Sequence, residues 1–131
     1  MALPSYEVKC LAAAMHKEAS GEGRHGQEAV ALVVLNRAFV SKKSICSVVK
    51  AKGQFSWYSG SIPAVNKSYR LLAIHMIEEY NRGTLKDFTN GATYFVHKRV
   101  RAKWLKHKKV VYKHKHHVFY KDNENAKLSR H

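Results

Sequence analysis

The stretch that decides the fold is Leu11–Arg37, LAAAMHKEASGEGRHGQEAVALVVLNR, in which two apolar segments flank a segment rich in glycine. The first segment extends back to Ser5, a good helix N-cap, so we predict a helix from near Ser5 to Glu18 or Ala19. The glycine-rich SGEGRHG between the two segments is typical of a loop. The second segment continues to Val40 and is apolar on nearly every side, which predicts a helix buried at the centre of the domain.

The segments that follow predict further helices and a polar loop. SKKSICSVVKAKG (41–53) has a mixed pattern that indicates a turn and a short helix, and QFSWYSGS (54–61) is typical of a loop with aromatic side chains. PAVNKSYRLLAIHMIEEYNR (63–82) predicts a helix, and Gly83 suits the position just after its end.

The last third of the chain changes in character. ATYFVHK (92–98) and KKVVYKHKHHVFYK (108–121) are rich in Tyr, Phe and Val and predict short strands, with a helical turn at RVRAKWL between them. We therefore predict a mostly helical α+β fold with a small antiparallel sheet near the C-terminus. One domain should span residues 1–131, with 121–131 as a frayed tail.

Charge is the strongest feature of the composition. The 131 residues carry a formal net charge of +15, and from Phe88 to Lys121 there are ten Lys or Arg and no acidic residue. Such a surface attracts polyanions, whether nucleic acid, anionic lipid or an acidic cell envelope. Cys10 and Cys46 fit no metal motif, and we interpret them as two buried free thiols, with a single disulfide as the alternative.

Targeting features are weak. No apolar run approaches the length of a membrane-spanning helix, and the N-terminal segment MALPSYEVKCLAAAMHKE lacks the basic start of a signal peptide. We therefore expect a protein that is made in the cytoplasm without a signal peptide.

Glu18 stands where an apolar helix face ends. It lies three, four and seven residues after Met15, Ala14 and Leu11, which places all four side chains on one face of the predicted helix. Packing against a core withdraws a carboxylate from water, and the C-terminal end of a helix disfavours negative charge. Both effects raise the pKa of a carboxyl group. Glu18 is therefore a candidate general acid, although a frayed surface glutamate remains the simpler interpretation of the spacing alone.

Several ordered motifs resemble those of the SleB-type cell wall hydrolases, the family of the spore cortex-lytic enzymes. EASGE (18–22) resembles the E-A-x-G-E of that family, and GQ followed by AVALVVLNR (26–37) resembles the segment after it. ICSVVKAKGQFSW (45–57) resembles a C-x-V-V and Q-F-S-W pair, while GATYFVH (91–97) and HHVFY (116–120) resemble the late strands. The resemblance covers about residues 10–121.

The resemblance implies a lysozyme-like catalytic domain that cleaves the MurNAc–GlcNAc bond of peptidoglycan, with Glu18 as the catalytic acid. Because the chain is poor in acidic residues, a lytic transglycosylase, which uses one Glu as both acid and base, fits better than an enzyme with two carboxylates. A compact domain without a signal peptide suggests a phage endolysin that acts on the host cell wall after release. We expect a monomer that needs no cofactor and no metal.

Residues for substrate binding are predicted from the need for aromatic planes beside amide, hydroxyl and imidazole groups in a sugar-binding cleft. The candidates are Gln54, Ser56 and Trp57 of QFSW, with Tyr94, His97 and His117 from the predicted strands. Glu22 is a further candidate for the cleft, with orienting Glu18 or its loop, or pairing with Arg24, as alternatives. The predicted partners are the glycan strands of peptidoglycan and, through the basic face, the anionic bacterial envelope.

Three alternatives stay open at this point. The enzyme could be a hydrolytic muramidase, or an amidase acting on the stem peptide. Amidases usually need zinc, and the histidines of KHKHH (113–117) have no acidic or Cys neighbour. A basic nucleic-acid-binding module would explain the charge and the interleaved aromatic residues. That class explains neither Glu18 nor QFSW, so we expect no specific nucleic acid partner.

Overall fold

A computed structural model of the chain describes residues 5–51 and 54–123. Its helices and strands are, in chain order, α1 (Ser5–Ala19), η1 (Ser20–Glu22), α2 (Gly23–Ser41), α3 (Ile45–Lys50), α4 (Lys67–Arg82), β1 (Tyr94–His97), η2 (Lys103–His107), β2 (Lys108–His114) and β3 (His117–Asp122), where η marks a short 3₁₀ helix. The predicted α+β architecture, mostly helical with a small sheet near the C-terminus, is confirmed.

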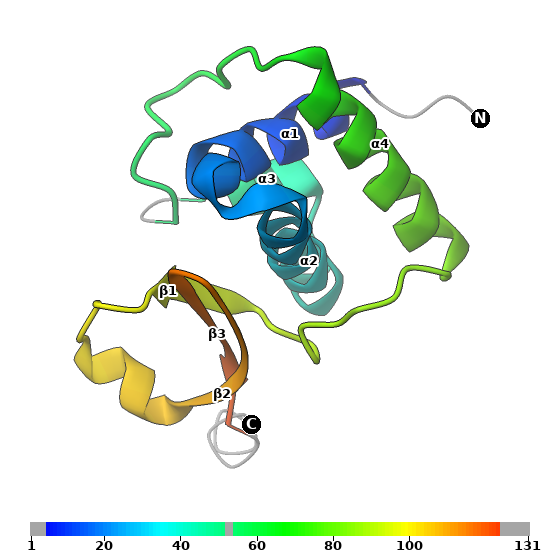
Figure 1. The fold of residues 1–131 in the computed structure, drawn as a ribbon. Helices are drawn as coiled ribbons and strands as arrows, with labels where there is room; N and C mark the ends of the chain where they lie inside the picture. Colours follow the sequence, from blue (N-terminus) through cyan, green and yellow to red (C-terminus); the bar gives the residue numbers. More distant parts are fainter. Residues whose placement is uncertain (1–4, 52–53, 124–131) are drawn as a thin grey trace.

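Helix α2 forms the centre of the molecule, as its apolar sequence predicts. Every residue from Ala29 to Leu35 is buried, because α1, α3 and α4 surround one part of the helix and the sheet covers another (Figure 1). Helix α1 buries Cys10–Met15 in the same core, so its small alanines allow close packing of the helices. Within the described ranges, no helix has the length and apolar character to cross a membrane.

The predicted loop at 20–26 is wrong, because η1 and the first turn of α2 occupy it. Gly26 is needed there for close approach rather than for flexibility. A Cβ atom on Gly26 would lie 2.4 Å from Cβ of Glu22 and 3.0 Å from Cδ2 of His114, so the glycine lets the sheet contact the start of α2. Helix α4 also begins later than predicted, at Lys67, but ends at Gly83 in a left-handed conformation as expected.

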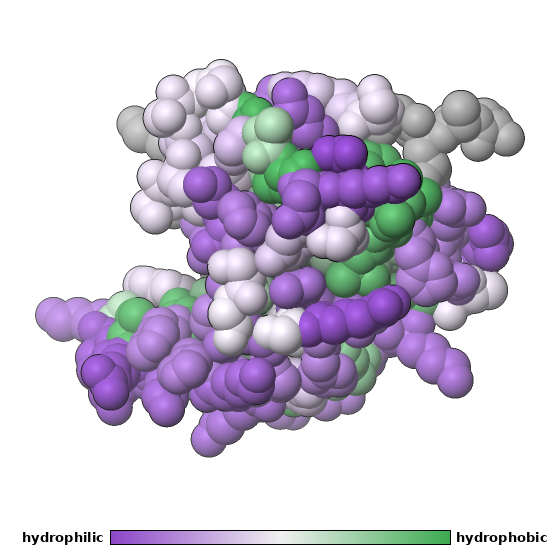
Figure 2. Space-filling view, turned by 45° about the horizontal axis from the view of Figure 1, so that its top comes forward, coloured by the Kyte–Doolittle hydropathy of each residue, from purple (hydrophilic) through white to green (hydrophobic). Residues whose placement is uncertain are grey.

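The sheet has three antiparallel strands in the order β1-β3-β2. Strands β2 and β3 form a hairpin, and β3 lies in the middle, where Phe119 is fully buried against Ala29 and Val33 of α2. Strand β3 extends to Asp122, so the predicted frayed tail begins too early; residues 124–131 lie outside the described residues. On the face seen in Figure 2, hydrophilic side chains cover most of the lower part of the molecule, where the sheet and η2 lie.

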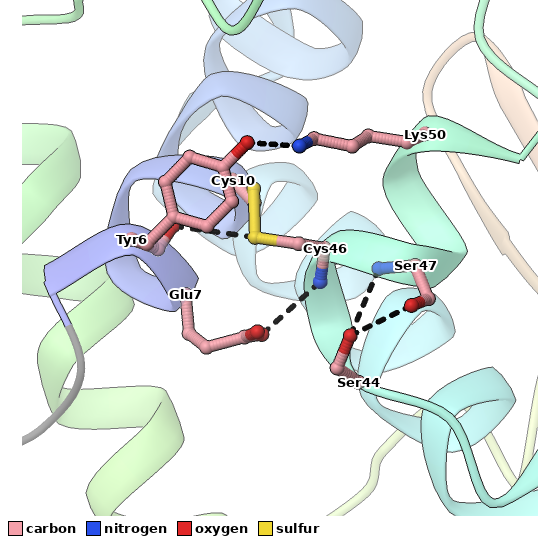
Figure 3. The surroundings of a disulfide bond; sticks show 7 residues. All are labelled: Tyr6, Glu7, Cys10, Ser44, Cys46, Ser47 and Lys50. Atoms are coloured by element: carbon pink, nitrogen blue, oxygen red, sulfur yellow. Dashed lines mark hydrogen bonds between the residues drawn. A yellow bond between two sulfur atoms is a disulfide. The ribbon is translucent and has the colours of Figure 1, made fainter.

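A disulfide joins Cys10 of α1 to Cys46 of α3, so the interpretation of these residues as free thiols is wrong (Figure 3). The fold brings their Cα atoms to 5.4 Å, a usual separation for a disulfide, although they are 36 positions apart in the sequence. The same contact is reinforced at the start of α3, where the amide of Cys46 donates a hydrogen bond to the Glu7 carboxylate at 3.1 Å. The bond therefore fixes α3 to the helix that carries Glu18.

Candidate active site

A cleft of about 660 Å³ lies between the helices and the sheet, within the size range of ligand-binding pockets. One wall comes from α1, α2, α3 and the loop after α3, and the other comes from β1, β3 and the segment between β1 and η2. Glu18 is its only carboxylate among the described residues. The lining also includes aliphatic side chains, aromatic rings and hydrogen-bonding groups: Val33, Val34, Val48, Phe55, Phe95, Tyr94, Trp104, Arg37, Gln54, His97 and His117.

Glu18 lies in the last turn of α1, half-buried in this cleft, which Val33, Val34 and Phe55 also line. Burial in these apolar surroundings raises the pKa of the carboxyl group above its ordinary value of 4.5. The indole N–H of Trp57 opposes this effect and lowers the pKa in part. That N–H is buried and meets no acceptor within normal hydrogen-bond geometry, so its contact with Glu18 is weak and burial prevails.

No cation neutralises Glu18 in the part of the chain that the structure describes, since none of the salt bridges found there includes it. A carboxyl group that is withdrawn from water and has no cationic partner keeps its proton to a higher pH than an exposed one. Glu18 can therefore donate a proton to a bound oxygen atom and then accept one as a carboxylate.

The structure brings five of the eight predicted site residues together in the cleft: Glu18, Gln54, Tyr94, His97 and His117. The other three do not line it. Ser56 is exposed outside the cleft, Trp57 packs against the core while its indole N–H approaches Glu18, and Glu22 is buried behind the cleft wall.

Glu22 fastens the tip of the β2–β3 hairpin to the connection between α1 and α2. Glu22 is only 6% exposed, and its carboxylate accepts a hydrogen bond from the backbone N–H of His116 at 3.1 Å. The second oxygen lies 2.9 Å from Nδ1 of His116. Burial acts to raise the pKa of Glu22, but the hydrogen bonds to His116 and the attraction of the imidazoles of His117 and His116 in their protonated forms outweigh it, so the pKa is lowered.

His117 stands between Glu22 and the cleft. Its Nδ1 is buried 3.5 Å from the Glu22 carboxylate, and its ring lines the cleft. Burial lowers the pKa of His117, and although Glu22 raises it, the other histidines His97, His116 and His114 lower it further. The imidazole is therefore neutral near pH 7 and can donate a hydrogen bond to a polar ligand or accept one from it. Glu22 does not line the cleft and contacts His117 from behind.

We expect Glu22→Gln to lower the free energy of unfolding by about 1–2 kcal/mol at pH 6, because the buried hydrogen bonds lose their charged acceptor. The lowered pKa fixes the sign of the pH dependence. The stabilisation is present above 4.5, the pKa of the unfolded chain, and is lost as the pH falls through the still lower pKa of the folded state. Urea unfolding at about pH 6 and about pH 3 measures it.

The matched control for this variant is Glu28→Gln, which removes an acidic residue of α2 whose nearest cation, Arg24, lies at 4.0 Å on the surface. Such a pair contributes only about 0.2–0.5 kcal/mol. Equal urea midpoints for the Glu22 and Glu28 variants at both pH values would contradict a stabilising role for Glu22.

Two cleft residues that could contact a sugar, Arg37 and Trp104, are missing from the predicted site residues. Arg37 is four residues after Val33 on α2, so helical spacing could have placed both on the cleft face. Its guanidinium lies 4.7 Å from the ring centre of Tyr94, and Nζ of Lys108 lies 3.9 Å from the same ring. Trp104 of η2 is 46% exposed and its ring centre is 6.0 Å from that of Tyr94, so the two rings form one aromatic wall of the cleft.

The histidine-rich hairpin has no arrangement of metal ligands within residues 5–51 and 54–123, where no three His, Cys, Asp or Glu side chains are grouped to hold an ion. His116 and His117 contact Glu22 instead, and Nε2 of His114 lies 3.1 Å from the Glu22 carbonyl oxygen. The cluster therefore holds the hairpin against the start of α2.

Comparison with known proteins identifies a family model that matches the sequence and two solved structures with a similar fold. The family model described as Cell Wall Hydrolase matches residues 21–120, a range that begins three residues after Glu18. No curated protein matches the chain. Two solved structures resemble it, each with a TM-score of 0.75 and 24% identity, which supports a shared fold. The catalytic domain of the Bacillus cereus SleB protein matches over 92% of this chain and 93% of that chain. The catalytic domain of the germination-specific lytic transglycosylase SleB from Bacillus anthracis matches over 91% and 97%.

Proposed function

Because the chain belongs to the cell wall hydrolase family, we propose that it degrades peptidoglycan by cleaving the β-1,4 bond between MurNAc and GlcNAc as a lytic transglycosylase. The observation that carries the proposal is Glu18, a half-buried carboxyl group with a raised pKa in a cleft of sugar-binding size. The Bacillus anthracis protein of similar fold is itself described as a lytic transglycosylase.

The proposed reaction uses one carboxyl group twice. Glu18 in its protonated form donates its proton to the glycosidic oxygen, the bond from that oxygen to C1 of MurNAc breaks, and GlcNAc leaves with a free 4-hydroxyl. The 6-hydroxyl of the same MurNAc attacks C1 and gives its proton to the Glu18 carboxylate. A 1,6-anhydro ring forms, no water is consumed, and Glu18 regains its starting protonation.

The supply of carboxylates favours this reaction over hydrolysis. Glycosidases that hydrolyse the bond place two carboxyl groups across it, about 5–9.5 Å apart. In the described part of the chain, Glu18 is the only carboxylate that lines the cleft, and Glu22 is engaged with His116 behind the wall. The single-acid mechanism needs no second group.

The rest of the cleft suits a sugar chain. Sugars have apolar C–H faces and polar edges, so aromatic planes next to hydrogen-bonding groups bind them. Tyr94 and Trp104 offer the planes, while Gln54, His97 and His117 offer donors and acceptors. The basic surface around the sheet would concentrate the enzyme at the anionic envelope, and we propose the host cell wall, reached as a phage endolysin, as its place of action.

Product analysis tests this function. Purified peptidoglycan is digested in water enriched in ¹⁸O, with a hydrolytic muramidase as the control, and the fragments are analysed by mass spectrometry. We expect 1,6-anhydromuramic ends without ¹⁸O from this protein and reducing ends with ¹⁸O from the control. Reducing ends with ¹⁸O from this protein would show a muramidase, and released stem peptides with intact glycan strands would show an amidase; either result contradicts the proposal.

A further inference from the structure

A second concavity, about 520 Å³ in volume, lies beside the cleft where η2 and the preceding segment face β2 and β3; we call it the basic groove. Four cationic residues line it, namely Arg101, Lys103, Lys106 and Lys108, and no acidic residue does. Leu105 and Tyr120 give it apolar surface. The groove therefore combines positive charge with apolar surface in one concave site.

Three of these cations are available to a ligand. Lys108 is engaged, because its ammonium group contacts Asp122 and the Tyr94 ring. Lys103 and Lys106 are exposed, and no carboxylate of the described residues pairs with them. Arg101 is also exposed and uses one of its terminal nitrogens for the carbonyl groups of Lys98 and Val100, at 3.1 and 3.2 Å. The other guanidinium N–H groups remain free to bind an anion.

The basic groove adjoins the cleft that contains Glu18. Val100 lines both concavities. Along η2, the Trp104 side chain lines the cleft, while its neighbours Lys103 and Leu105 line the groove. A branch that leaves a sugar chain in the cleft can therefore pass over Val100 and enter the groove without leaving the protein surface.

We propose that the basic groove binds the stem peptide that branches from the lactyl group of MurNAc, and that it makes peptide-bearing strands the preferred substrate. This inference rests on the proposed action on peptidoglycan. The stem peptide is short, carries several carboxylates and has small apolar side chains between them. Lys103, Lys106 and Arg101 match the carboxylates, and the apolar surface of Leu105 and Tyr120 matches the rest of the peptide.

Binding to the inactive Glu18→Gln protein tests the inference independently of catalysis. The isotope-labelled protein is titrated with a soluble GlcNAc–MurNAc-peptide and with the same disaccharide without its peptide, and backbone amide signals are followed by NMR. We expect the signals of Lys103, Leu105 and Lys106 to shift with the peptide-bearing ligand alone. The peptide should tighten binding about tenfold, the scale of one to two charge-assisted contacts on the surface.

Charge reversal supplies the matched comparison. Lys103→Glu with Lys106→Glu should abolish the advantage of the peptide-bearing ligand. Lys109→Glu with Lys113→Glu makes the same change of charge at exposed positions of β2 outside both concavities. This control pair should retain at least half of the wild-type ratio of affinities for the peptide-bearing and peptide-free ligands. Circular dichroism confirms that each variant is folded.

Three results would overturn the inference: equal affinities for the two sugar ligands, equal loss of affinity in both pairs of variants, or tighter binding of a glycerol-phosphate oligomer than of the peptide at the groove. Failure of the proposed function gives a different result. If the protein binds the peptide in the basic groove but releases no fragments from peptidoglycan, the inference about the groove stands and the proposed cleavage reaction is wrong.

Discussion

Glu18→Gln is expected to lower the rate of peptidoglycan cleavage by about 10²–10⁴-fold, the usual contribution of general acid–base catalysis. Glutamine has nearly the same shape as glutamic acid but cannot donate a proton to the glycosidic oxygen or accept one from the 6-hydroxyl. Because Glu18 is the only carboxylate lining the cleft among the described residues, no neighbour can replace it. The rate is measured by release of soluble fragments from purified peptidoglycan.

The same substitution should increase stability near neutral pH. The folded protein holds the Glu18 proton more tightly than the unfolded chain, because burial raises its pKa above 4.5. The protein therefore loses stability as the pH rises from the pKa of Glu18 in the unfolded chain through its higher pKa in the folded protein, because the buried carboxyl group must then ionise. Glutamine carries no such cost, so thermal unfolding of the variant should occur at a higher temperature than that of the wild type above this range, and at a similar temperature below about pH 4.

The control for Glu18 is Glu78→Gln in α4, which removes a partly exposed carboxylate that is paired with Arg82 at 3.1 Å and does not line the cleft. It should leave the cleavage rate within about twofold of the wild type, since it touches neither the cleft nor the buried core. A Glu18→Gln protein that kept more than a tenth of the wild-type rate would contradict the assignment of Glu18 as the acid and base.

Removal of the disulfide by Cys10→Ala with Cys46→Ala should lower the free energy of unfolding by about 2–4 kcal/mol. The bond closes a loop across a sequence separation of 36, so its loss gives the unfolded chain considerable freedom. Both residues are buried, at 0% and 5% exposure, and alanine avoids placing new hydroxyl groups in the core. Urea unfolding of the oxidised wild type and the double variant measures the difference.

Reduction of the wild type is the control for the double variant. A reductant should shift the urea midpoint of the wild type towards that of the double variant and leave the double variant unchanged. Equal midpoints for oxidised wild type and double variant would contradict the stabilising role of the bond. Because α1 also carries Glu18, cleavage by the double variant should be lost at a lower temperature than cleavage by the wild type.

The sequence predicted those helices and strands that are determined by residues close together in the chain. The apolar residues of α2 required a buried helix whatever surrounded it, and the spacing of Glu18 from Leu11 and Met15 identified its face of α1. The strands followed from their Tyr, Phe and Val content, and Gly83 ended α4 as expected because a left-handed residue favours glycine.

Features that depend on distant contacts could not be predicted. Glycines 23 and 26 indicated a loop, but a contact with His114, 88 positions beyond Gly26, explains the second of them. Glu22 was predicted as a candidate to line the cleft, whereas its hydrogen bonds to His116 span 94 positions and no local pattern indicates them. The pairing of Cys10 with Cys46 and the position of the basic groove next to the cleft depend in the same way on tertiary packing.

Direct titration of the Glu18 carboxyl group tests the central claim, which is that burial in the cleft keeps this acid protonated to a higher pH. The side-chain carboxyl carbon is followed by NMR from acidic to neutral pH, and the signal absent from Glu18→Gln identifies it. We predict a midpoint above 4.5, with the cleavage rate falling as the pH rises through the same midpoint. A midpoint at or below 4.5, or a cleavage rate that does not follow the ionisation of Glu18, would contradict the account.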